Sequence, residues 1–162
     1  MYGKLAEKEV KHMNTSITVG QVLRAKGHDS HAIAPDATAY SALELMADKN
    51  VGALMVSENG KLVGVFSERD YARKVILKGK ASKSTTVREI MTSSPITVKP
   101  AMTLRECMVL MTQKRIRHLP VLDNDVILGV ISIGDVVNAI ISEQESTIEE
   151  LQEYIAGTGY RA

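Results

Sequence analysis

Cysteine is nearly missing from this chain, which has one, Cys107, among its 162 residues. A single thiol cannot form an internal disulfide or a cysteine-based zinc site, so we expect a reducing compartment, the cytoplasm. Apolar runs approaching the roughly 20 residues of a membrane span are also missing, and the charged N-terminus is not that of a signal peptide. The net charge of +1 argues against nucleic-acid binding through a broadly basic surface.

Residue arrangements typical of catalysis are missing as well. We find no Ser/His/Asp set, no carboxylate pair in catalytic company and no glycine-rich loop for phosphate. His12, His28 and His31 lack the mutual spacing of metal ligands. Cys107 shares an apolar helical stripe with Leu104, so we expect it in the core and not as a nucleophile. The sequence therefore predicts a protein that is not an enzyme and holds no metal.

Charge nearly cancels over the chain but is unevenly distributed. Between positions 69 and 88 a single acid, Asp70, faces many bases: Arg69, Arg73, Lys74, Lys78, Lys80, Lys83 and Arg88. The C-terminal tail has acids and no base among them: Glu143, Glu145, Glu149, Glu150 and Glu153. Such runs are usually solvent-facing surface. The basic run begins inside a repeated segment, which leaves a ligand role open.

One short segment is written twice. Residues 64–70 read Gly-Val-Phe-Ser-Glu-Arg-Asp, and residues 129–135, which lie 65 positions later, read Gly-Val-Ile-Ser-Ile-Gly-Asp. The same offset relates other residues: Pro35 to Pro100, Thr38 to Thr103, Leu54 to Leu119 and Asn59 to Asn124. A gapless self-match of about forty residues indicates a duplicated unit.

The Ser-x-x-Asp in each copy has two interpretations. Locally it is a capping box, in which the serine hydroxyl accepts a backbone N–H while the aspartate reaches back. Alternatively, each strand-to-helix turn presents a hydroxyl and a carboxylate to a ligand. The two roles can coexist, and the residues alone leave both open.

Hydrophobic periodicity and turn residues predict an α+β fold made of two β-α-β-β-α units. We place the first repeat at residues 15–80 and the second at 81–142, after an N-terminal arm at 1–14. The first unit is expected to contain a strand at 31–35, a helix with Asp36 or Thr38 as its N-cap and Ala39, Ala42, Leu43 and Met46 at helical spacing, strands at 51–56 and 62–66, and a helix at 69–77. Those of the second are 96–98, 103–114, 119–122, 127–131 and 135–141. A separate helix over 143–155 is expected in the tail, 143–162, with an apolar stripe of Ile148, Leu151 and Ile155.

The paired units resemble CBS domains, the repeats named after cystathionine β-synthase, and together they look like a Bateman module. The shared marks are a Pro-x-x-Thr, an Asn-containing hairpin and Gly-Val-x-Ser-x-x-Asp, each present in both units. Residues 91–98, Met-Thr-Ser-Ser-Pro-Ile-Thr-Val, and 115–121, Arg-Ile-Arg-His-Leu-Pro-Val, are also typical of the second repeat. The likeness covers about residues 15–142.

This resemblance implies a tandem pseudo-twofold pair with two clefts, to which the C-terminal helix is an addition. In such modules the turn aspartate binds ribose hydroxyls of AMP, ADP, ATP, S-adenosylmethionine or NAD, and many members are regulatory sensors. We therefore expect a sensor that binds an adenosine nucleotide. The alternative is a structural dimerisation module whose clefts bind nothing and which acts through an unidentified protein partner. Because Bateman modules commonly pair, a homodimer is expected in either case.

The resemblance also assigns residues to each cleft. One cleft should centre on Asp135 and Ser132, with walls from Ala32, Ile33, Val51, Gly52 and Ala53. The other should centre on Asp70, Ser67 and Arg69, with walls from Pro95, Ile96, Thr97 and Ile116. Arg117 and His118 stand at phosphate-binding positions of either cleft.

The two clefts should not be equivalent. Arg69 precedes the aspartate in the first turn, where Gly134 stands in the second, and Arg73 follows Arg69 on the same helical face. A guanidinium suits phosphate because its planar fork binds two oxygens together. We expect the Asp70 cleft to take the more highly charged ligand, NAD or ADP, and the Asp135 cleft to accept AMP.

Overall fold

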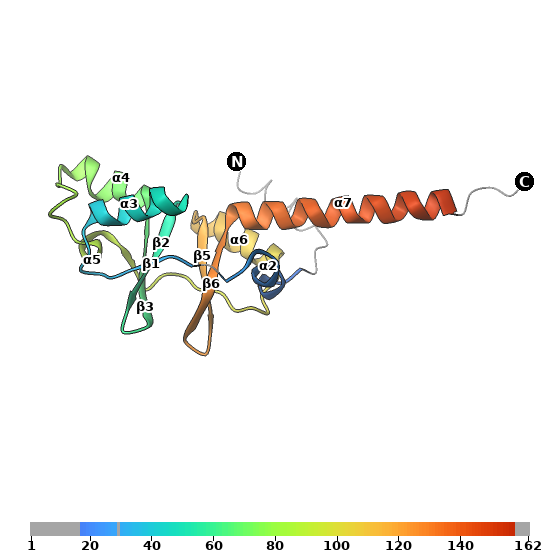
Figure 1. The fold of residues 1–162 in the computed structure, drawn as a ribbon, viewed down its shortest axis with the longest axis horizontal. Helices are drawn as coiled ribbons and strands as arrows, with labels where there is room; N and C mark the ends of the chain where they lie inside the picture. The colour runs from blue at the N-terminus through green and yellow to red at the C-terminus, as the bar shows by residue number, and fades with distance from the viewer. Residues whose placement is uncertain (1–16, 29, 158–162) are drawn as a thin grey trace, which may run out of the picture.

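Two small α+β units lie next to each other, and a long helix extends from the second (Figure 1). The computed structural model describes residues 17–28 and 30–157; the expected N-terminal arm lies outside them. The elements up to the middle of the chain are α2 (Val19–Lys26), β1 (Ala32–Ile33), α3 (Ala39–Lys49), β2 (Ala53–Glu58), β3 (Lys61–Ser67), α4 (Glu68–Lys74) and η1 (Ile76–Lys78). The remaining ones are α5 (Val87–Ile90), β4 (Thr92–Ser93), α6 (Leu104–Lys114), β5 (His118–Asp123), β6 (Val126–Ser132) and α7 (Ile133–Gly157).

The two sheets share a plan that confirms the duplication. In the first, β1 runs parallel to β2, β2 and β3 form an antiparallel hairpin, and β4 pairs with the far edge of β3. In the second, β5 and β6 form the same hairpin. Val98 makes a parallel bridge to Val121, at the position where Ile33 pairs with Val56 in β1. The strand expected at 96–98 is thus reduced to one bridge.

Equivalent residues shape equivalent helix ends and turns. Thr38 and Thr103 cap α3 and α6, and each accepts a backbone N–H three residues ahead. Asn59 and Asn124 occupy the hairpin turns with left-handed backbones, at φ 50° and 47°. Asparagine tolerates this conformation better than most residues, which explains its presence at both positions.

The hydrophobic core is split in two, and each half draws on both repeats. The first core, around Phe66 and Leu54, includes Val87 and Ile90 of α5. The second, around Ile131 and Leu119, includes three buried side chains of α2: Val19, Val22 and Leu23. Each short helix therefore packs in the unit that the other repeat builds. The boundary between the repeats at residue 80 stays a prediction. The packing of α2 and α5 crosses this boundary.

The glycine of each repeated segment, Gly64 in β3 and Gly129 in β6, accommodates this exchange. A Cβ at Gly64 would lie 2.5 Å from the Met91 sulfur and 3.0 Å from the Thr92 carbonyl oxygen. A Cβ at Gly129 would lie 3.0 Å from a methyl carbon of Leu23. Met91 follows α5 and Leu23 belongs to α2, so both glycines make room for a segment contributed by the other repeat.

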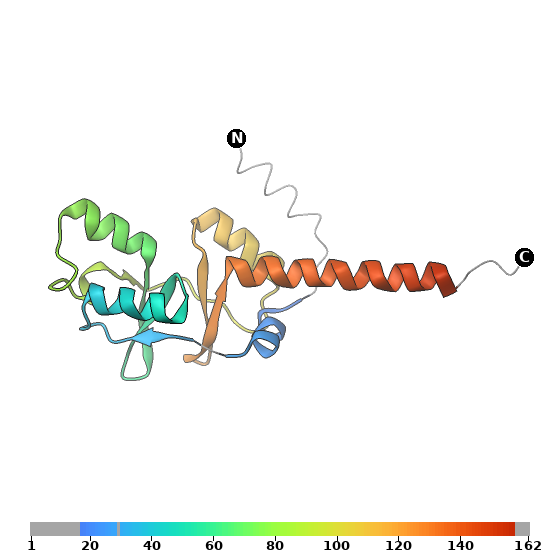
Figure 2. The same cartoon turned by 45° about the horizontal axis from the view of Figure 1, so that its top comes forward.

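The C-terminal helix is present, but it is not separate. The segments expected at 135–141 and 143–155 form one continuous helix, α7, which extends well beyond the two units (Figure 2). No glycine or proline interrupts residues 135–156, so nothing in the backbone ends the helix. The helix expected at 69–77 is shorter than predicted, because α4 ends at Lys74 and a 3₁₀ turn follows. Over the described residues, no helix combines the length and apolar character needed to span a membrane.

Candidate functional site

A cavity of about 270 Å³ opens where the two repeats meet. Its walls come from the β3–α4 turn, from β4 with the loop that follows, and from the corner between α6 and β5. The lining residues are Val65, Ser67, Arg69, Asp70, Thr92, Ser94, Pro95, Ile96, Arg115, Ile116, Arg117 and His118. Apolar, hydroxyl, acidic and basic groups thus converge in one small space, as is typical of ligand pockets.

Most of the residues that line this cavity are among those expected from the sequence in the Asp70 cleft. Of the residues expected around Asp70, those that line it are Ser67, Arg69, Pro95, Ile96 and Ile116, together with Arg117 and His118. Thr97 is not among the lining residues. Four lining residues were not expected: Val65, Thr92, Ser94 and Arg115. A signal for Thr92 and Ser94 existed, because they lie inside the 91–98 motif directly before Pro95.

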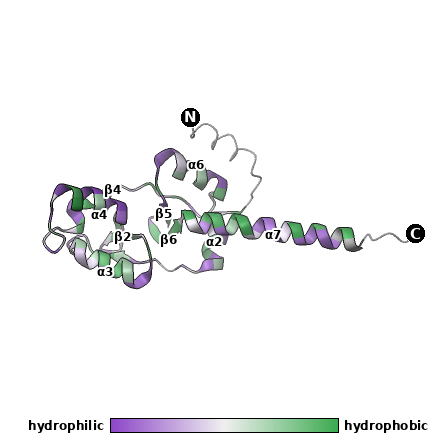
Figure 3. Ribbon diagram, turned by 90° about the horizontal axis from the view of Figure 1, so that it is seen from above, coloured by the Kyte–Doolittle hydropathy of each residue, from purple (hydrophilic) through white to green (hydrophobic). Residues whose placement is uncertain are grey.

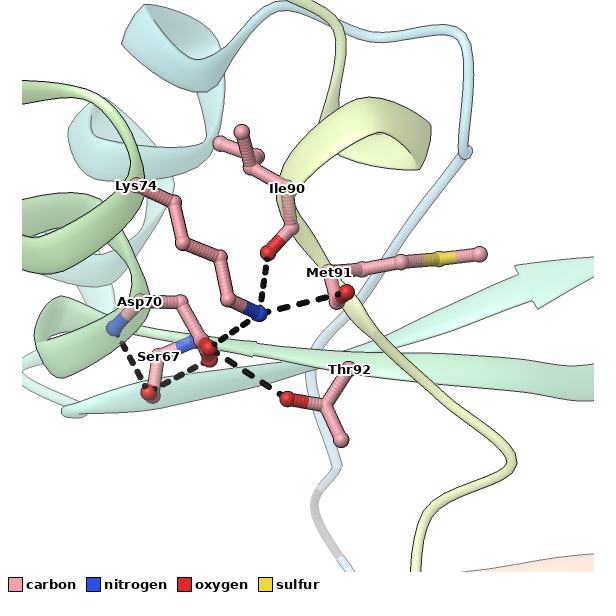
Figure 4. Close-up of polar contacts among 6 residues, drawn as sticks. All are labelled: Ser67, Asp70, Lys74, Ile90, Met91 and Thr92. Atoms are coloured by element: carbon pink, nitrogen blue, oxygen red, sulfur yellow. Dashed lines mark hydrogen bonds and ion pairs between the residues drawn. The ribbon is translucent and has the colours of Figure 1, made fainter. Parts of the chain in front are cut away.

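The Ser67–Asp70 turn is a capping box, as the local interpretation predicted (Figure 4). The Ser67 hydroxyl donates to Oδ2 of Asp70 at 2.7 Å, and the Asp70 backbone N–H donates to Ser67 Oγ at 3.2 Å. The other carboxylate oxygen, Oδ1, lies 2.8 Å from Lys74 Nζ and 3.3 Å from Thr92 Oγ1. One oxygen therefore serves the helix, while the second lies next to a cavity-lining hydroxyl.

The Ser132–Asp135 turn has a similar cap but a different cation. The backbone N–H of Ser132 donates to Asp135 Oδ2 at 2.8 Å, and Lys26 Nζ reaches the same oxygen at 2.7 Å. Burial would raise the pKa of Asp135, but these donors, led by Lys26, bring it below its ordinary value. Lys26 corresponds to Ser94 of the other cleft when α2 is aligned with α5, so a cation replaces a hydroxyl. The two turns are thus unequal.

The other residues expected around Asp135 are only partly brought together. Ile33 and Val51 are partly buried and pack against the first core. Gly52 accepts the N–H of Glu68 through its carbonyl oxygen, and a Cβ there would lie 3.6 Å from the His118 ring. Ala32 pairs with Met55 at the edge of the sheet, and Ala53 begins β2.

A second, shallower hollow of about 710 Å³ adjoins the cavity. We call it the basic groove, because its lining includes five cationic side chains: Arg69, Arg73, Lys114, Arg115 and Arg117. Among the described residues, none of these five forms an ion pair. Arg69 also donates to the carbonyl oxygen of Arg115 at 2.7 Å, which holds α4 against the end of α6. Expected site residue Arg73 lies in this groove and not among the cavity residues.

His118 lines the cavity and lies near a carboxylate of each turn, Glu68 and Asp135. Burial lowers its pKa below the ordinary value of 6.5, while the carboxylates of Asp135 and Glu68 act in the opposite direction. The ring is therefore neutral at pH 7 and available as a hydrogen-bond donor or acceptor. The described residues contain no group of three or more His, Cys, Asp or Glu that could hold a metal ion.

We expect the His118 ring to titrate below pH 6.5 in ligand-free protein, measured by NMR with His118→Gln to assign the resonance. Because the pKa is lower in the folded chain, the unfolded chain binds more protons between the two values. The free energy of unfolding should then decrease as the pH falls below about 6.5. A phosphate ester in the cavity should move the midpoint upward. A ligand-free midpoint at or above 6.5 would show that burial does not control this ring.

The fold and the paired turns define the class of this protein. It is a tandem repeat with a cavity, lined by both polar and apolar side chains, where the two repeats meet. The CBS domain family model matches residues 13–76 and 87–142. The chain therefore belongs to the CBS domain family.

Relatives and solved structures agree with this assignment. The chain is 42% identical over 154 residues to the CBS domain-containing protein CBSX3, mitochondrial, of Arabidopsis thaliana, covering 90% of this chain and 74% of that one. A solved protein with CBS domains from Burkholderia ambifaria is 45% identical with a TM-score of 0.77, covering 79% of this chain and 96% of that one. A CBS domain pair solved with 5′-methylthioadenosine and S-adenosyl-L-methionine has a TM-score of 0.71 at 21% identity, covering 80% and 99%, which establishes the shared fold.

Proposed function

We propose that this CBS pair is a regulatory sensor that binds an adenosine nucleotide in the cavity next to Asp70. The observation that carries the proposal is the cavity itself, which joins the Ser67–Asp70 turn to apolar walls and to guanidinium groups. The related fold solved with two adenosine compounds supports this choice of ligand class. The proposed role is binding and not turnover.

Each part of a nucleotide finds suitable chemistry in this cavity. Oδ1 of Asp70 can accept from ribose hydroxyls, and such charge-assisted hydrogen bonds are stronger than neutral ones. Ile96 and Ile116 offer apolar surface for the flat faces of adenine. Arg69 and Arg117 supply fixed positive charge for phosphate, with the basic groove beyond them.

The cleft at Asp135 would bind more weakly. Lys26 forms a short ion pair with Oδ2 of Asp135, and any ligand that separated this pair would do so at a cost. Asp70 also has an ion pair, to Lys74 through Oδ1, but Asp70 lines the cavity described above, whereas Asp135 does not. We therefore expect the first nucleotide to bind at Asp70.

Substituting Arg69 by glycine should reduce affinity for NAD or ADP by about ten-fold and affinity for AMP by less, measured by calorimetry. The change copies Gly134 of the other turn and removes one cation from the cavity. A charge-assisted contact contributes roughly 1.5–3 kcal/mol. A diphosphate carries more negative charge than a monophosphate, so it should lose more binding energy when the guanidinium is removed. The difference should shrink at high salt, because screening weakens exposed charge contacts.

Arg73→Gly is the matched control, because it makes the same change in the same helix without removing a cavity-lining side chain. It should carry a similar helix cost with a smaller effect on binding. Equal losses for all ligands after Arg69→Gly, or no loss at all, would mean that Arg69 does not contact phosphate.

The alternative function is a structural dimerisation module whose clefts bind nothing. A thermal unfolding curve that no adenosine compound shifts would favour it, since a ligand that binds only the folded chain must stabilise it. We expect a homodimer under either function, no nucleic-acid or membrane partner, and a downstream protein partner. The cytoplasmic location also belongs to this proposal, although the related plant protein is named as mitochondrial.

A further inference from the structure

Helix α7 carries two apolar faces, and only one of them is buried within the described part of the chain. Val136 and Ile140 are buried in the second core. A second row of side chains is exposed along the helix, at 44% for Val137, 47% for Ile141, 54% for Ile148 and 55% for Leu151. Figure 3 shows green, hydrophobic positions recurring along the part of α7 that projects from the two units. An apolar stripe of this length on a projecting helix indicates a helix partner.

The stripe is symmetric about its middle. Its steps of four, seven and three residues follow a coiled-coil seam, with Gln144 filling the long step. Val137 and Leu151 each lie seven residues from Gln144, while Ile141 and Ile148 lie three and four residues away. When two copies of the helix run antiparallel and cross at Gln144, Val137 faces Leu151 and Ile141 faces Ile148 of the other. A twofold axis requires this kind of self-complementary surface.

Charge selects the antiparallel arrangement. The acids of the outer half, including Glu149 and Glu153, have no base among them, and α7 contains no lysine or arginine. The inner end begins at Ile133, which lines the basic groove together with Arg69 and Arg115. Antiparallel pairing brings the acidic half of each helix to the groove of the other chain, and it also opposes the helix dipoles. Parallel pairing would place the two acidic halves side by side.

We propose that two copies of this chain pair through antiparallel α7 helices, with the acidic half of each helix lying at the basic groove of the other. The proposal rests on the homodimer expected above and specifies its surface. The groove shares Arg69, Arg115 and Arg117 with the nucleotide cavity. The carboxylates of one chain and the phosphates of a ligand on the other therefore use the same cations, so a highly charged nucleotide loosens this contact.

Analytical ultracentrifugation of the full chain tests the surface. The parent should be a dimer at micromolar concentration, and Ile148→Glu/Leu151→Glu should be a monomer that keeps its circular dichroism and binds a highly charged nucleotide at least as tightly as the parent. Ser146→Glu, an exposed position on the opposite side of α7, is the matched control and should remain dimeric. A dimeric double variant would overturn the α7 surface but not the homodimer. A monomeric parent would overturn both the α7 surface and the homodimer. It would leave the proposed nucleotide binding untouched, because calorimetry tests that binding separately.

Direction is tested by disulfide cross-linking. Antiparallel pairing predicts a cross-linked dimer when Val137→Cys chains are mixed with Leu151→Cys chains, and little from Val137→Cys alone. In that arrangement two copies of residue 137 lie about 14 residues apart along the helix, or roughly 21 Å. Native Cys107 should not interfere, because it is buried, and burial raises its thiol pKa to about 11. Efficient cross-linking of Val137→Cys to itself would contradict the antiparallel arrangement.

Discussion

Asp70→Asn should weaken binding of AMP, ADP or NAD by about ten- to a hundred-fold. The substitution keeps the shape of the side chain but removes the negative charge that accepts ribose hydroxyls. A hydrogen bond to a charged group contributes roughly 1.5–3 kcal/mol, and every 1.4 kcal/mol is tenfold in affinity. Calorimetric titration of parent and variant with the same ligand gives the ratio directly.

The control for Asp70→Asn is Asp135→Asn, the equivalent change in the other turn. Both variants disturb a capping box, so both should lose about 0.5–2 kcal/mol of stability. Only the Asp70 variant should lose most of the affinity for the first nucleotide, because Asp70 lines the cavity and Asp135 does not. Equal affinities for parent and Asp70→Asn would show that the ribose assignment is wrong.

Phe66→Ala should lower the free energy of unfolding by about 3–5 kcal/mol, since it empties a fully buried aromatic site in the first core. The melting temperature should fall by roughly 6–20 °C for a chain of this size. The loss should appear as one shifted transition for the whole chain. Each core contains a helix from the other repeat, α5 or α2, so the repeats cannot unfold independently.

Scanning calorimetry with circular dichroism measures this effect. Val126→Ala, an exposed hairpin residue of similar chemistry, should change stability by less than about 0.5 kcal/mol. Two separate transitions, of which Phe66→Ala moves only one, would contradict the coupling of the two cores.

Duplication made much of the fold predictable from the sequence. The Asn59 and Asn124 turns, the Thr38 and Thr103 caps and the paired strands follow from local chemistry that the chain states twice. The Asp70 cavity was largely predictable for the same reason, because its turn and its apolar walls belong to motifs of fixed spacing.

The remaining features depend on contacts between segments far apart in the chain. The exchange of α2 and α5 cannot be deduced from periodicity, since an apolar face does not specify which core it enters. Lys26 lies 109 positions before Asp135, and no local pattern links a lysine near a glycine turn to that carboxylate. The continuity of α7 was not predicted, although no glycine or proline interrupts residues 135–156, because the second repeat was expected to end at 142 and the tail to form a helix of its own.

Calorimetric titration of the purified parent with AMP, ADP, NAD and S-adenosylmethionine tests the central claim most directly. The account predicts saturable binding of at least one of them, with the first molecule binding at one per chain and about ten- to a hundred-fold more weakly in Asp70→Asn. A folded parent that gives no binding heat and no thermal shift with any of the four would contradict it and leave the structural dimerisation module.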